Sequence, residues 1–449
     1  MTNNAQQPLS NSASQQTQFT PTFTQELVRY LYSGLWLILL PFTVFVSLYK
    51  GITRSKDYLQ RLPERYGFFA RTNKTGGTLI HCVSVGEVVA ATPLIKLLQA
   101  QNPNASITIT TTTPTGSQRV TDTFGDTVNH VYLPYDLPYA VKSLLNRFQP
   151  QTLLITEVEL WPNLIHYAWQ RQIPVTIVNA RLTDRSYRSY AKFPNLFAPM
   201  LKKVATLCAQ GQRDYNNYLK FGVNPAHVEL TNNIKFDQPL TSADMQQAQS
   251  FVDELQLTSR QVLIGGSTHD PEEQELIEAY KALKPEFPNL LLLLVPRHPQ
   301  RFNKVSQLVT SNQLTLQHLS ECTSVDLTTD VLLADKMGIL KPLYGTATCA
   351  FVGGSINNRG GHNALEPAMF AVPTVMGPHT YNNPDICQAL LAAKALYTVH
   401  NANDITALFR NWLQNESERT LAGNAGKQVV TENSGALAKT LSIINSNQR

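Results

Sequence analysis

The first clear hydrophobic pattern in the chain is an apolar segment near its start. Residues 31–49 contain no charged side chain, and residues 35–46 are almost wholly apolar. A bilayer core needs about 20 such residues, so the segment is just long enough to span a membrane. Pro41 predicts a kink, which membrane helices tolerate. We predict a membrane anchor over residues 27–50, with a buried core helix or a cleaved signal peptide as alternatives.

The residues that flank the anchor indicate its orientation. Residues 1–26 are rich in Asn, Gln, Ser and Thr, which predicts a disordered tail. A group of cations follows the apolar segment, where the positive-inside rule predicts the cytoplasmic side and attraction to anionic lipid. These cations are Lys50, Arg54, Lys56, Arg61 and Arg65.

Beyond the anchor, short apolar runs alternate with helical patterns in two units, residues 51–237 and 238–449. The predicted strands are residues 78–83, 107–112, 152–156 and 175–179 in the first unit, and 262–265, 290–295, 331–333 and 349–352 in the second. Polar residues gather after each strand, which is typical of a parallel sheet with a ligand crevice at its carboxyl edge. The fold class is therefore α/β, with two Rossmann-like domains facing a cleft. The last helix either stays with the second domain or returns to the first.

Composition narrows the possible partners. The chain has 449 residues, 43% of them hydrophobic and 15% charged, which is ordinary for a globular protein of two or three domains. The net charge of +5 is mild and fits an anionic partner such as a phospholipid surface or a phosphorylated substrate. Five scattered cysteines without CxxC spacing argue against disulfides and against a zinc site.

Three carboxylates stand directly after predicted strands of the first unit. Glu87 follows Gly86 in the first turn of a predicted helix, where it is either a helix cap or an acceptor of a substrate proton. Glu157 and Glu159 would face the same way if the strand continued. Their repulsion would then raise the pKa of one of them or require a basic partner.

The second unit carries a set of residues suited to an anionic ligand. Ser267 and Thr268 open a predicted helix, which they either cap or equip as a phosphate site. Arg297 and His298 lie in a turn between two prolines. The glycine-rich segment 353–366 is the richest in candidates. Its backbone amides are predicted to approach a ligand, with Gly361, His362 and Asn363 at a helix start and Glu366 binding the hydroxyls of a ribose.

The ordered set of these motifs resembles one family, the 3-deoxy-D-manno-octulosonic acid (Kdo) transferases of lipopolysaccharide synthesis in Gram-negative bacteria. The resemblance covers roughly residues 30–435. The matching segments are residues 81–87, 111–116, 133–136, 157–163, 179–182, 267–269, 296–302 and 353–379. One departure is Asn232, which stands where the family usually has glycine. Because asparagine tolerates a left-handed backbone, we expect the turn to survive.

The resemblance implies a glycosyltransferase-B fold, CMP-Kdo as donor substrate, and no cofactor or metal. The implied acceptor is the 6′-hydroxyl of a tetraacylated, bisphosphorylated lipid A precursor. Glu87 matches the catalytic base, and Glu157 and Glu159 match a second acidic position. Arg297, Asn363 and Glu366 match CMP contacts, and Met337 and Gly338 match a backbone site near cytosine.

The implied location is the cytoplasmic face of the bacterial inner membrane, on anionic lipid, with a single N-terminal anchor. We expect no nucleic-acid partner. Arg54, Arg61, Arg65 and Arg185 are candidates to hold the phosphates of the acceptor. A UDP-sugar epimerase and a non-catalytic nucleotide-sugar binding protein remain as alternatives. The number of Kdo units added and the oligomeric state stay open.

Overall fold

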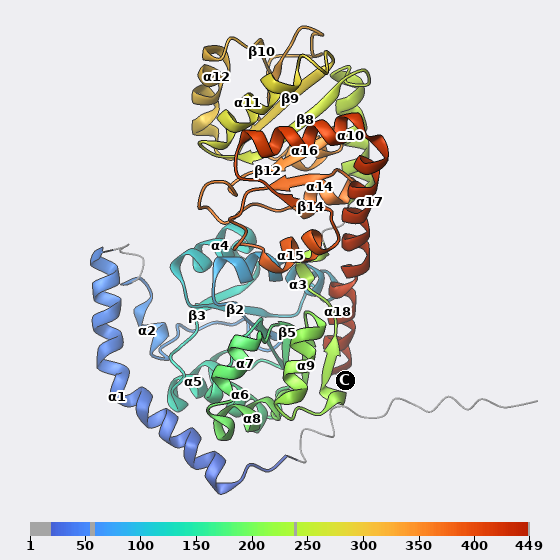
Figure 1. Cartoon of the computed structure of the whole chain (residues 1–449). Coiled ribbons are helices and arrows are strands. Elements are labelled where there is room, and N and C mark those ends of the chain that lie inside the picture. Colours follow the sequence, from blue (N-terminus) through green and yellow to red (C-terminus); the bar gives the residue numbers. More distant parts are fainter. Residues whose placement is uncertain (1–18, 54–58, 238–239, 448–449) are drawn as a thin grey trace, which may run out of the picture. The chain divides into compact units, whose positions relative to one another are not determined.

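The structure, a computed structural model, describes residues 19–53, 59–237 and 240–447. It divides the chain into two compact units, Met1–Asp237 with Ser434–Arg449 (unit 1) and Gln238–Asn433 (unit 2) (Figure 1). Most of the predicted tail, together with Arg54 and Lys56, lies outside the described residues.

Unit 1 is built on a seven-stranded parallel sheet with the order β3-β2-β1-β4-β5-β6-β7. The strand order reverses between β1 and β4, and such switch points are where open α/β sheets bind ligands. The strands are β1 (Thr78–His81), β2 (Ile107–Thr111), β3 (Asn129–Tyr132), β4 (Thr152–Thr156), β5 (Val175–Ala180), β6 (Thr206–Ala209) and β7 (Val228–Leu230).

The helices of unit 1 cover its sheet, and the last helix of the chain, α18, packs against α3 with Leu437, Leu441 and Ile444. The helices are α1 (Phe23–Thr53), α2 (Leu62–Arg65), α3 (Val85–Gln101), α4 (Pro114–Phe124), α5 (Pro138–Phe148), α6 (Pro162–Gln170), α7 (Asp184–Tyr190), α8 (Pro194–Leu201), α9 (Gln212–Lys220) and α18 (Ala436–Asn447), with short 3₁₀ turns η3 (Gly125–Thr127), η4 (Pro225–His227) and η5 (Ile234–Phe236).

Unit 2 has a second seven-stranded parallel sheet, with the order β10-β11-β9-β8-β12-β13-β14. Its order reverses between β8 and β12. All residues of β9 are buried, as expected for a parallel strand covered on both faces. The strands are β8 (Gln261–Thr268), β9 (Leu290–Pro296), β10 (Leu316–His318), β11 (Val331–Leu333), β12 (Cys349–Val352), β13 (Thr374–Met376) and β14 (Leu396–Thr398).

The helices of unit 2 lie on both faces of this sheet. Leu276, Ile277 and Tyr280 of α11 join β9 in one buried cluster, which also includes Phe409 and Trp412 of α16. The helices are α10 (Ser242–Glu254), α11 (Glu272–Leu283), α12 (Phe302–Ser311), α13 (Leu340–Tyr344), α14 (Leu365–Met369), α15 (Pro384–Ala392), α16 (Ala402–Gln414) and α17 (Glu416–Asn433), with the turn η6 (Pro299–Arg301).

Every predicted strand is present, so the two Rossmann-like units are confirmed. The strands β3, β6, β7, β10, β13 and β14 were not predicted; each is short and lies at or next to a sheet edge. The five cysteines are unpaired, and all except Cys322 are buried, as expected for small apolar residues.

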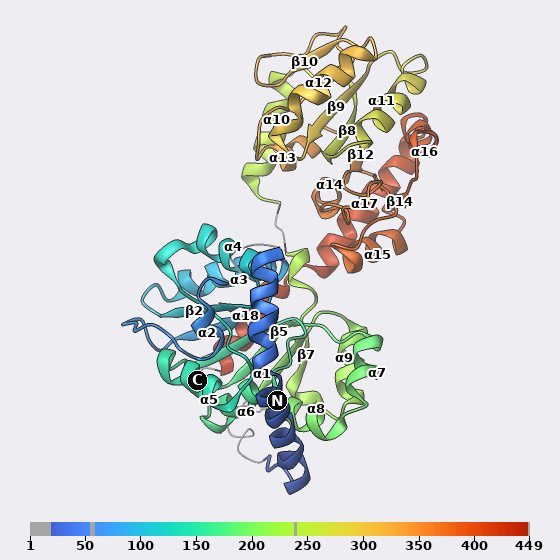
Figure 2. The same ribbon diagram turned by 90° about the vertical axis from the view of Figure 1, so that its left-hand side faces the viewer.

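Helix α1 begins at Phe23, four residues before the predicted start of the anchor, and runs to Thr53. By length and composition it is the one helix among the described residues that is able to cross a membrane. A core helix is excluded, because a whole face of α1 is exposed, including Ile38 and Phe45. Figures 1 and 2 show α1 running along one side of unit 1.

Candidate active site

Glu87 lies at the switch point of the sheet in unit 1, in the first turn of α3. Its Oε2 accepts a hydrogen bond from the amide of Val83 at 2.8 Å and lies 2.7 Å from the hydroxyl of Thr156. Its Oε1 accepts from the hydroxyl of Ser84 at 3.3 Å. Burial raises the pKa of Glu87, and these hydrogen bonds oppose that shift. The carboxylate is thus held in a fixed position by three hydrogen bonds.

Glu157 follows β4 but does not continue it. Its φ of +56° turns the chain into the left-handed region, so the strand ends at Thr156 as predicted and does not hold Glu157 and Glu159 on one face. The carboxylate of Glu157 instead forms an ion pair with Nζ of Lys235 at 3.1 Å. Lys235 follows Asn232, which has a φ of +68°, so the predicted left-handed turn is present.

Glu159 has the most perturbed carboxylate of the three. Burial, followed by the charges of Glu87 and Glu157, raises the pKa of Glu159 to about 7. Because the strand does not continue, the predicted condition for repulsion between Glu157 and Glu159 is not met. Burial is the largest cause of the raised pKa of Glu159, and Glu157 has a basic partner in Lys235.

Unit 2 contains a pocket of about 410 Å³ at the carboxyl ends of β8 and β9. It combines three cations, those of Arg297, Lys336 and Lys341, with the carboxylate of Glu366. Its remaining lining residues are Ser267, Val295, Pro296, Met337, Gly338, Leu340, Tyr344, His362 and Asn363. Cations beside one carboxylate suit a ligand that carries both phosphate and hydroxyl groups.

The structure brings together seven of the ten predicted donor residues, Ser267, Arg297, Met337, Gly338, His362, Asn363 and Glu366. The other three do not line the pocket. Thr268 is fully buried at the end of β8, and its hydroxyl has no partner among the described residues. His298 is exposed outside the pocket, with its ring 5.3 Å from that of His269.

Gly361 is the third predicted donor residue outside the pocket. Its amide donates to the carbonyl of Gly354 at 2.7 Å, and the amide of His362 donates to that of Gly353 at 3.0 Å. The helix begins only at Leu365. The prediction that Gly361 and His362 offer free amides at a helix start is therefore wrong, since the loop uses both.

The glycine-rich loop after β12 binds a carboxylate of the protein itself. Glu272, which is fully buried, accepts hydrogen bonds from the amides of Gly354 (2.8 Å), Ser355 (2.7 Å), Ile356 (3.0 Å) and His269 (2.9 Å). Burial raises the pKa of Glu272, and the four amides oppose the shift. The loop amides were predicted to approach a ligand, but Glu272 occupies the anion position that they form.

His269 was not among the predicted site residues. Its Nε2 lies 3.0 Å from Nε2 of His362, and the two rings stack with centroids 5.2 Å apart. Burial and neighbouring cations lower the pKa of both rings to about 4, so both are neutral at pH 7. One Nε2 must then donate and the other accept, which fixes the orientation of His362 at the pocket wall.

Lys336, Lys341 and Tyr344 also escaped prediction. Lys336 and Lys341 flank the predicted Met337 and Gly338, so the local sequence did carry a signal. Nζ of Lys341 donates to Asp244 at 2.6 Å and holds the pKa of that carboxyl at about 2. Tyr344 is buried, and its hydroxyl occupies the space that a side chain at Gly266 would need.

Two Rossmann-like units, each built on a seven-stranded parallel sheet, are the features of the GT-B fold of glycosyltransferases. A solved glycosyltransferase from Rickettsia africae ESF-5 shares the fold, with a TM-score of 0.50 and 13% identity over 84% of this chain and 100% of that chain.

Sequence comparison identifies the family. A profile described as "3-Deoxy-D-manno-octulosonic-acid transferase (kdotransferase)" matches residues 60–238. A 3-deoxy-D-manno-octulosonic acid transferase of Haemophilus influenzae is 40% identical over 420 residues, 93% of this chain and 98% of its own length. The solved C-terminal CMP-Kdo binding domain of WaaA from Acinetobacter baumannii is 32% identical and covers 42% of this chain and 99% of that chain, with a TM-score of 0.41. The chain belongs to the Kdo transferase family, and its activity is Kdo transfer. The epimerase alternative is thereby excluded.

Proposed function

We propose that the chain transfers Kdo from CMP-Kdo to the 6′-hydroxyl of the tetraacyldisaccharide 1,4′-bisphosphate lipid A precursor (lipid IVA), with inversion at the anomeric carbon. The observation that carries the donor half is the pocket of unit 2, where Arg297, Lys336 and Lys341 face one carboxylate, that of Glu366. A nucleoside monophosphate joined to an acidic sugar has the matching charges.

In the proposed donor complex, Arg297 binds the phosphate and the carboxylate of Glu366 accepts from the ribose hydroxyls. His362 and Asn363 line the phosphate side, and Met337 with Gly338 lies against the base. Burial raises the pKa of Glu366. A hydrogen bond from Asn363 and the nearby cations of Lys341 and Arg297 oppose this shift. Thr268, His298 and Gly361 act only by supporting this pocket, since they do not line it.

The proposed chemistry is a single displacement. Glu87 takes the proton of the acceptor hydroxyl while the hydroxyl oxygen of the acceptor bonds to the anomeric carbon of Kdo. The bond from that carbon to the phosphate oxygen breaks, and CMP leaves with the electron pair. Arg297 stabilises the charge that develops on the phosphate, so the leaving group needs no protonation and no metal is invoked. Glu157 and Glu159 form the second acidic position, and burial raises the pKa of Glu159 to about 7.

The proposed acceptor and location are supported by α1, by the cations that follow it and by Arg185 at the start of α7. Helix α1 anchors the chain to the cytoplasmic face of the inner membrane, next to anionic lipid. Arg185 is exposed and so is able to reach an acceptor phosphate. Arg61 is already engaged, because it pairs with Glu64 at 2.8 Å and donates to the carbonyl of His130 at 2.6 Å. Arg65 is engaged as well, because it donates to the carbonyl of Thr112 at 2.8 Å and lies over the ring of Tyr132.

The test is transfer by the Glu87→Gln and Glu87→Ala variants, assayed with CMP-Kdo and lipid IVA, with mass spectrometry to count the sugars added. Both variants should bind CMP as the unchanged protein does and lose transfer by at least ~100-fold, the lower range for loss of a positioned base. Glu229→Gln, an exposed acid in β7, is the matched control and should leave transfer unchanged. Full activity of Glu87→Gln would refute the assignment of the base, and a non-catalytic binding protein would show no transfer from the start.

A further inference from the structure

Helix α1 has its polar and apolar faces in the reverse of the usual order. A surface helix of a soluble protein turns its apolar stripe to the core and its polar stripe to water. In α1 the buried residues are Arg29, Ser33, Ser47 and Gly51, which face the rest of unit 1. The outer stripe, spaced by seven residues, is Leu31, Ile38, Phe45 and Ile52, exposed by 64%, 70%, 70% and 82%.

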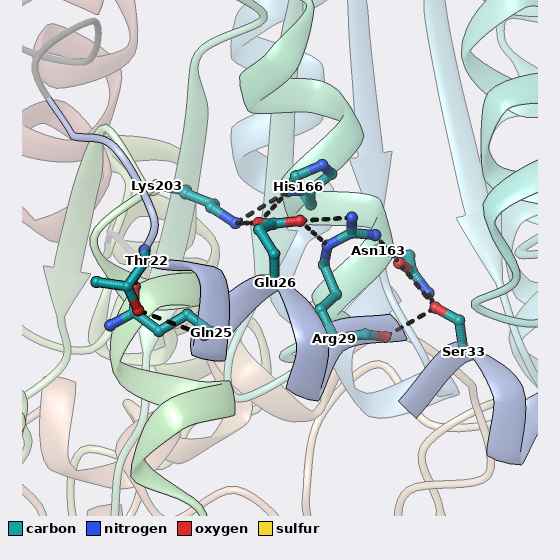
Figure 3. Close-up of polar contacts among 8 residues, drawn as sticks. All are labelled: Thr22, Gln25, Glu26, Arg29, Ser33, Asn163, His166 and Lys203. Atoms are coloured by element: carbon teal, nitrogen blue, oxygen red, sulfur yellow. Dashed lines mark hydrogen bonds and ion pairs between the residues drawn. The ribbon is translucent and has the colours of Figure 1, made fainter. Parts of the chain in front are cut away.

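A cluster of charged and polar side chains fastens the start of α1 to unit 1 (Figure 3). Nε and Nη2 of Arg29 donate to Oε2 of Glu26 at 3.0 and 2.6 Å, and Nη1 donates to Oδ1 of Asn163 at 3.0 Å. The other carboxylate oxygen of Glu26 accepts from Nζ of Lys203 at 3.4 Å. Burial and the cations of Lys203 and Arg29 lower the pKa of His166 to about 3, so its neutral Nδ1 accepts from Lys203 at 2.9 Å.

Two residues from the family motifs also bind α1. Asp136 accepts from the amides of Asn163 and Leu164 at 2.8 and 2.9 Å, which caps α6, and from the hydroxyl of Tyr32 at 3.1 Å. The side-chain amide of Asn163 donates to the hydroxyl of Ser33 at 3.0 Å. Asp136 and Asn163 therefore join α1 to α6.

Contacts continue to the far end of α1. The ring of Trp36 lies 5.6 Å from that of Tyr135, and the hydroxyls of Thr43 and Tyr66 are 3.0 Å apart. At Gly51 an added Cβ would meet the side chain of Leu59 at 2.6 Å, so the two segments are in close contact there.

These contacts decide how α1 can meet a membrane. From Glu26 to Gly51 the helix rises about 38 Å, more than the roughly 30 Å of a bilayer core. A helix that crossed the bilayer with these contacts intact would carry Lys203, Asp136 and the loops around them into hydrocarbon, which is costly for charged groups.

We propose that α1 is an in-plane anchor: its outer stripe lies along the interface of an anionic phospholipid bilayer, and its polar stripe stays bound to unit 1. A bilayer is the occupant because residues 31–49 carry no charge, Tyr30 and Tyr49 lie exposed near the two ends of this segment, and Lys50 follows it. Aromatic and basic residues at the ends of an apolar face are typical of interfacial helices. Exposed Phe68, beyond α2, extends the apolar surface.

The inference rests on the proposed membrane attachment. Measuring the depth of single positions in the bilayer separates the in-plane arrangement of α1 from attachment itself. The full chain with Cys322→Ser is given one cysteine at a time, as Leu31→Cys, Ile38→Cys or Phe45→Cys, and labelled with an environment-sensitive fluorophore. It is then bound to phosphatidylethanolamine–phosphatidylglycerol vesicles with nitroxides at two depths. An in-plane helix gives the same depth at all three positions. A spanning helix gives depths that differ by about 10 Å between neighbouring positions, the rise of seven residues.

Ser47→Cys is the matched control, because its side chain faces unit 1 and should react slowly with the fluorophore. In cells, Thr20→Cys should be shielded from a membrane-impermeant reagent to the same degree as native Cys322, since an in-plane helix keeps both on one side. Graded depths, or labelling of Thr20→Cys from the opposite side, would overturn the in-plane arrangement. Vesicle binding without quenching would assign the stripe to another occupant, such as a second copy of the chain. No vesicle binding would refute the attachment itself.

Discussion

The hydroxyl of Thr156 lies 2.7 Å from Oε2 of Glu87 and so links the last residue of β4 to the first turn of α3. The same carboxylate oxygen accepts from the amide of Val83. Two short donors on one oxygen favour the charged form of Glu87, against the burial that raises its pKa. The adjacent strands β1 and β4 thus set the protonation of the proposed base.

Thr156→Val should raise the pKa of Glu87 further, because it removes a donor that stabilises the carboxylate. A base with a higher pKa is protonated over a wider acid range, so the acid limb of the kcat/KM–pH profile should move to higher pH. A hydrogen bond to a charged group contributes about 1.5–3 kcal/mol, enough to slow transfer about tenfold or more on that limb.

Thr156→Ser is the control for that profile, since it keeps the hydroxyl. Its acid limb should stay where it is in the unchanged protein. An unmoved limb in Thr156→Val would mean that Glu87 is not the group that titrates in transfer.

Arg297→Ala should weaken CMP binding, because Arg297 is a cation of the donor pocket. Loss of a charge-assisted hydrogen bond predicts a Kd for CMP that is about 10- to 100-fold higher, measured by calorimetry. Arg297→Lys should recover only part of the affinity, since lysine lacks the bidentate geometry. Arg410, on α16, forms an exposed ion pair with Glu286, and Arg410→Ala should leave the Kd unchanged.

The strands and the carboxylates after them were predictable because their signals are local. An apolar run such as Leu290–Pro296, followed by polar residues, specifies a buried parallel strand and its functional edge. The left-handed turn at Asn232 also follows from one residue type. Short outer strands such as β14 (Leu396–Thr398), which bury less of their surface, carry a weaker pattern.

What escaped prediction depends on partners far away in the chain. The sequence pattern of a glycine-rich loop is the same whether its amides bind a phosphate or a carboxylate of the protein. Here they bind Glu272, which lies 82 residues from Gly354 in the chain. Likewise, an uncharged segment indicates an anchor, but only the fold shows that Arg29 meets Asn163, 134 residues away. Local pattern therefore identified the apolar helix α1 without its attachment to the rest of unit 1.

Glu272→Gln should destabilise unit 2. The side-chain amide presents a donor where the carboxylate accepted, and so leaves at least some of the four backbone amides unpaired. Each buried unpaired group costs about 1–3 kcal/mol, so we expect a loss of at least about 3 kcal/mol in the free energy of unfolding, together with weaker CMP binding. Thermal and denaturant unfolding of the whole chain measures it.

Glu278→Gln, an exposed position on the same helix, is the control for that loss and should change stability by less than about 0.5 kcal/mol. Equal stability of the two variants would show that Glu272 does not hold the loop.

The stacked pair His269 and His362 predicts that unit 2 loses stability in acid. Both folded pKa values, about 4, lie below the ordinary value of 6.5. Between these values the unfolded chain binds more protons than the folded one, so stability falls as the pH drops from about 6.5 towards 4. Protonating both rings would also set two Nε2–H groups against each other across 3.0 Å. The Tm of His362→Gln, measured from pH 7 to pH 4, should therefore fall less steeply than that of the unchanged protein, whereas exposed His400→Gln should follow the unchanged protein.

Bound CMP places an anion near His362 and favours its charged form, so CMP should reduce the acid loss in the unchanged protein and have less effect on the slope in His362→Gln. Parallel curves for His362→Gln and the unchanged protein would show that the pair does not titrate in this range.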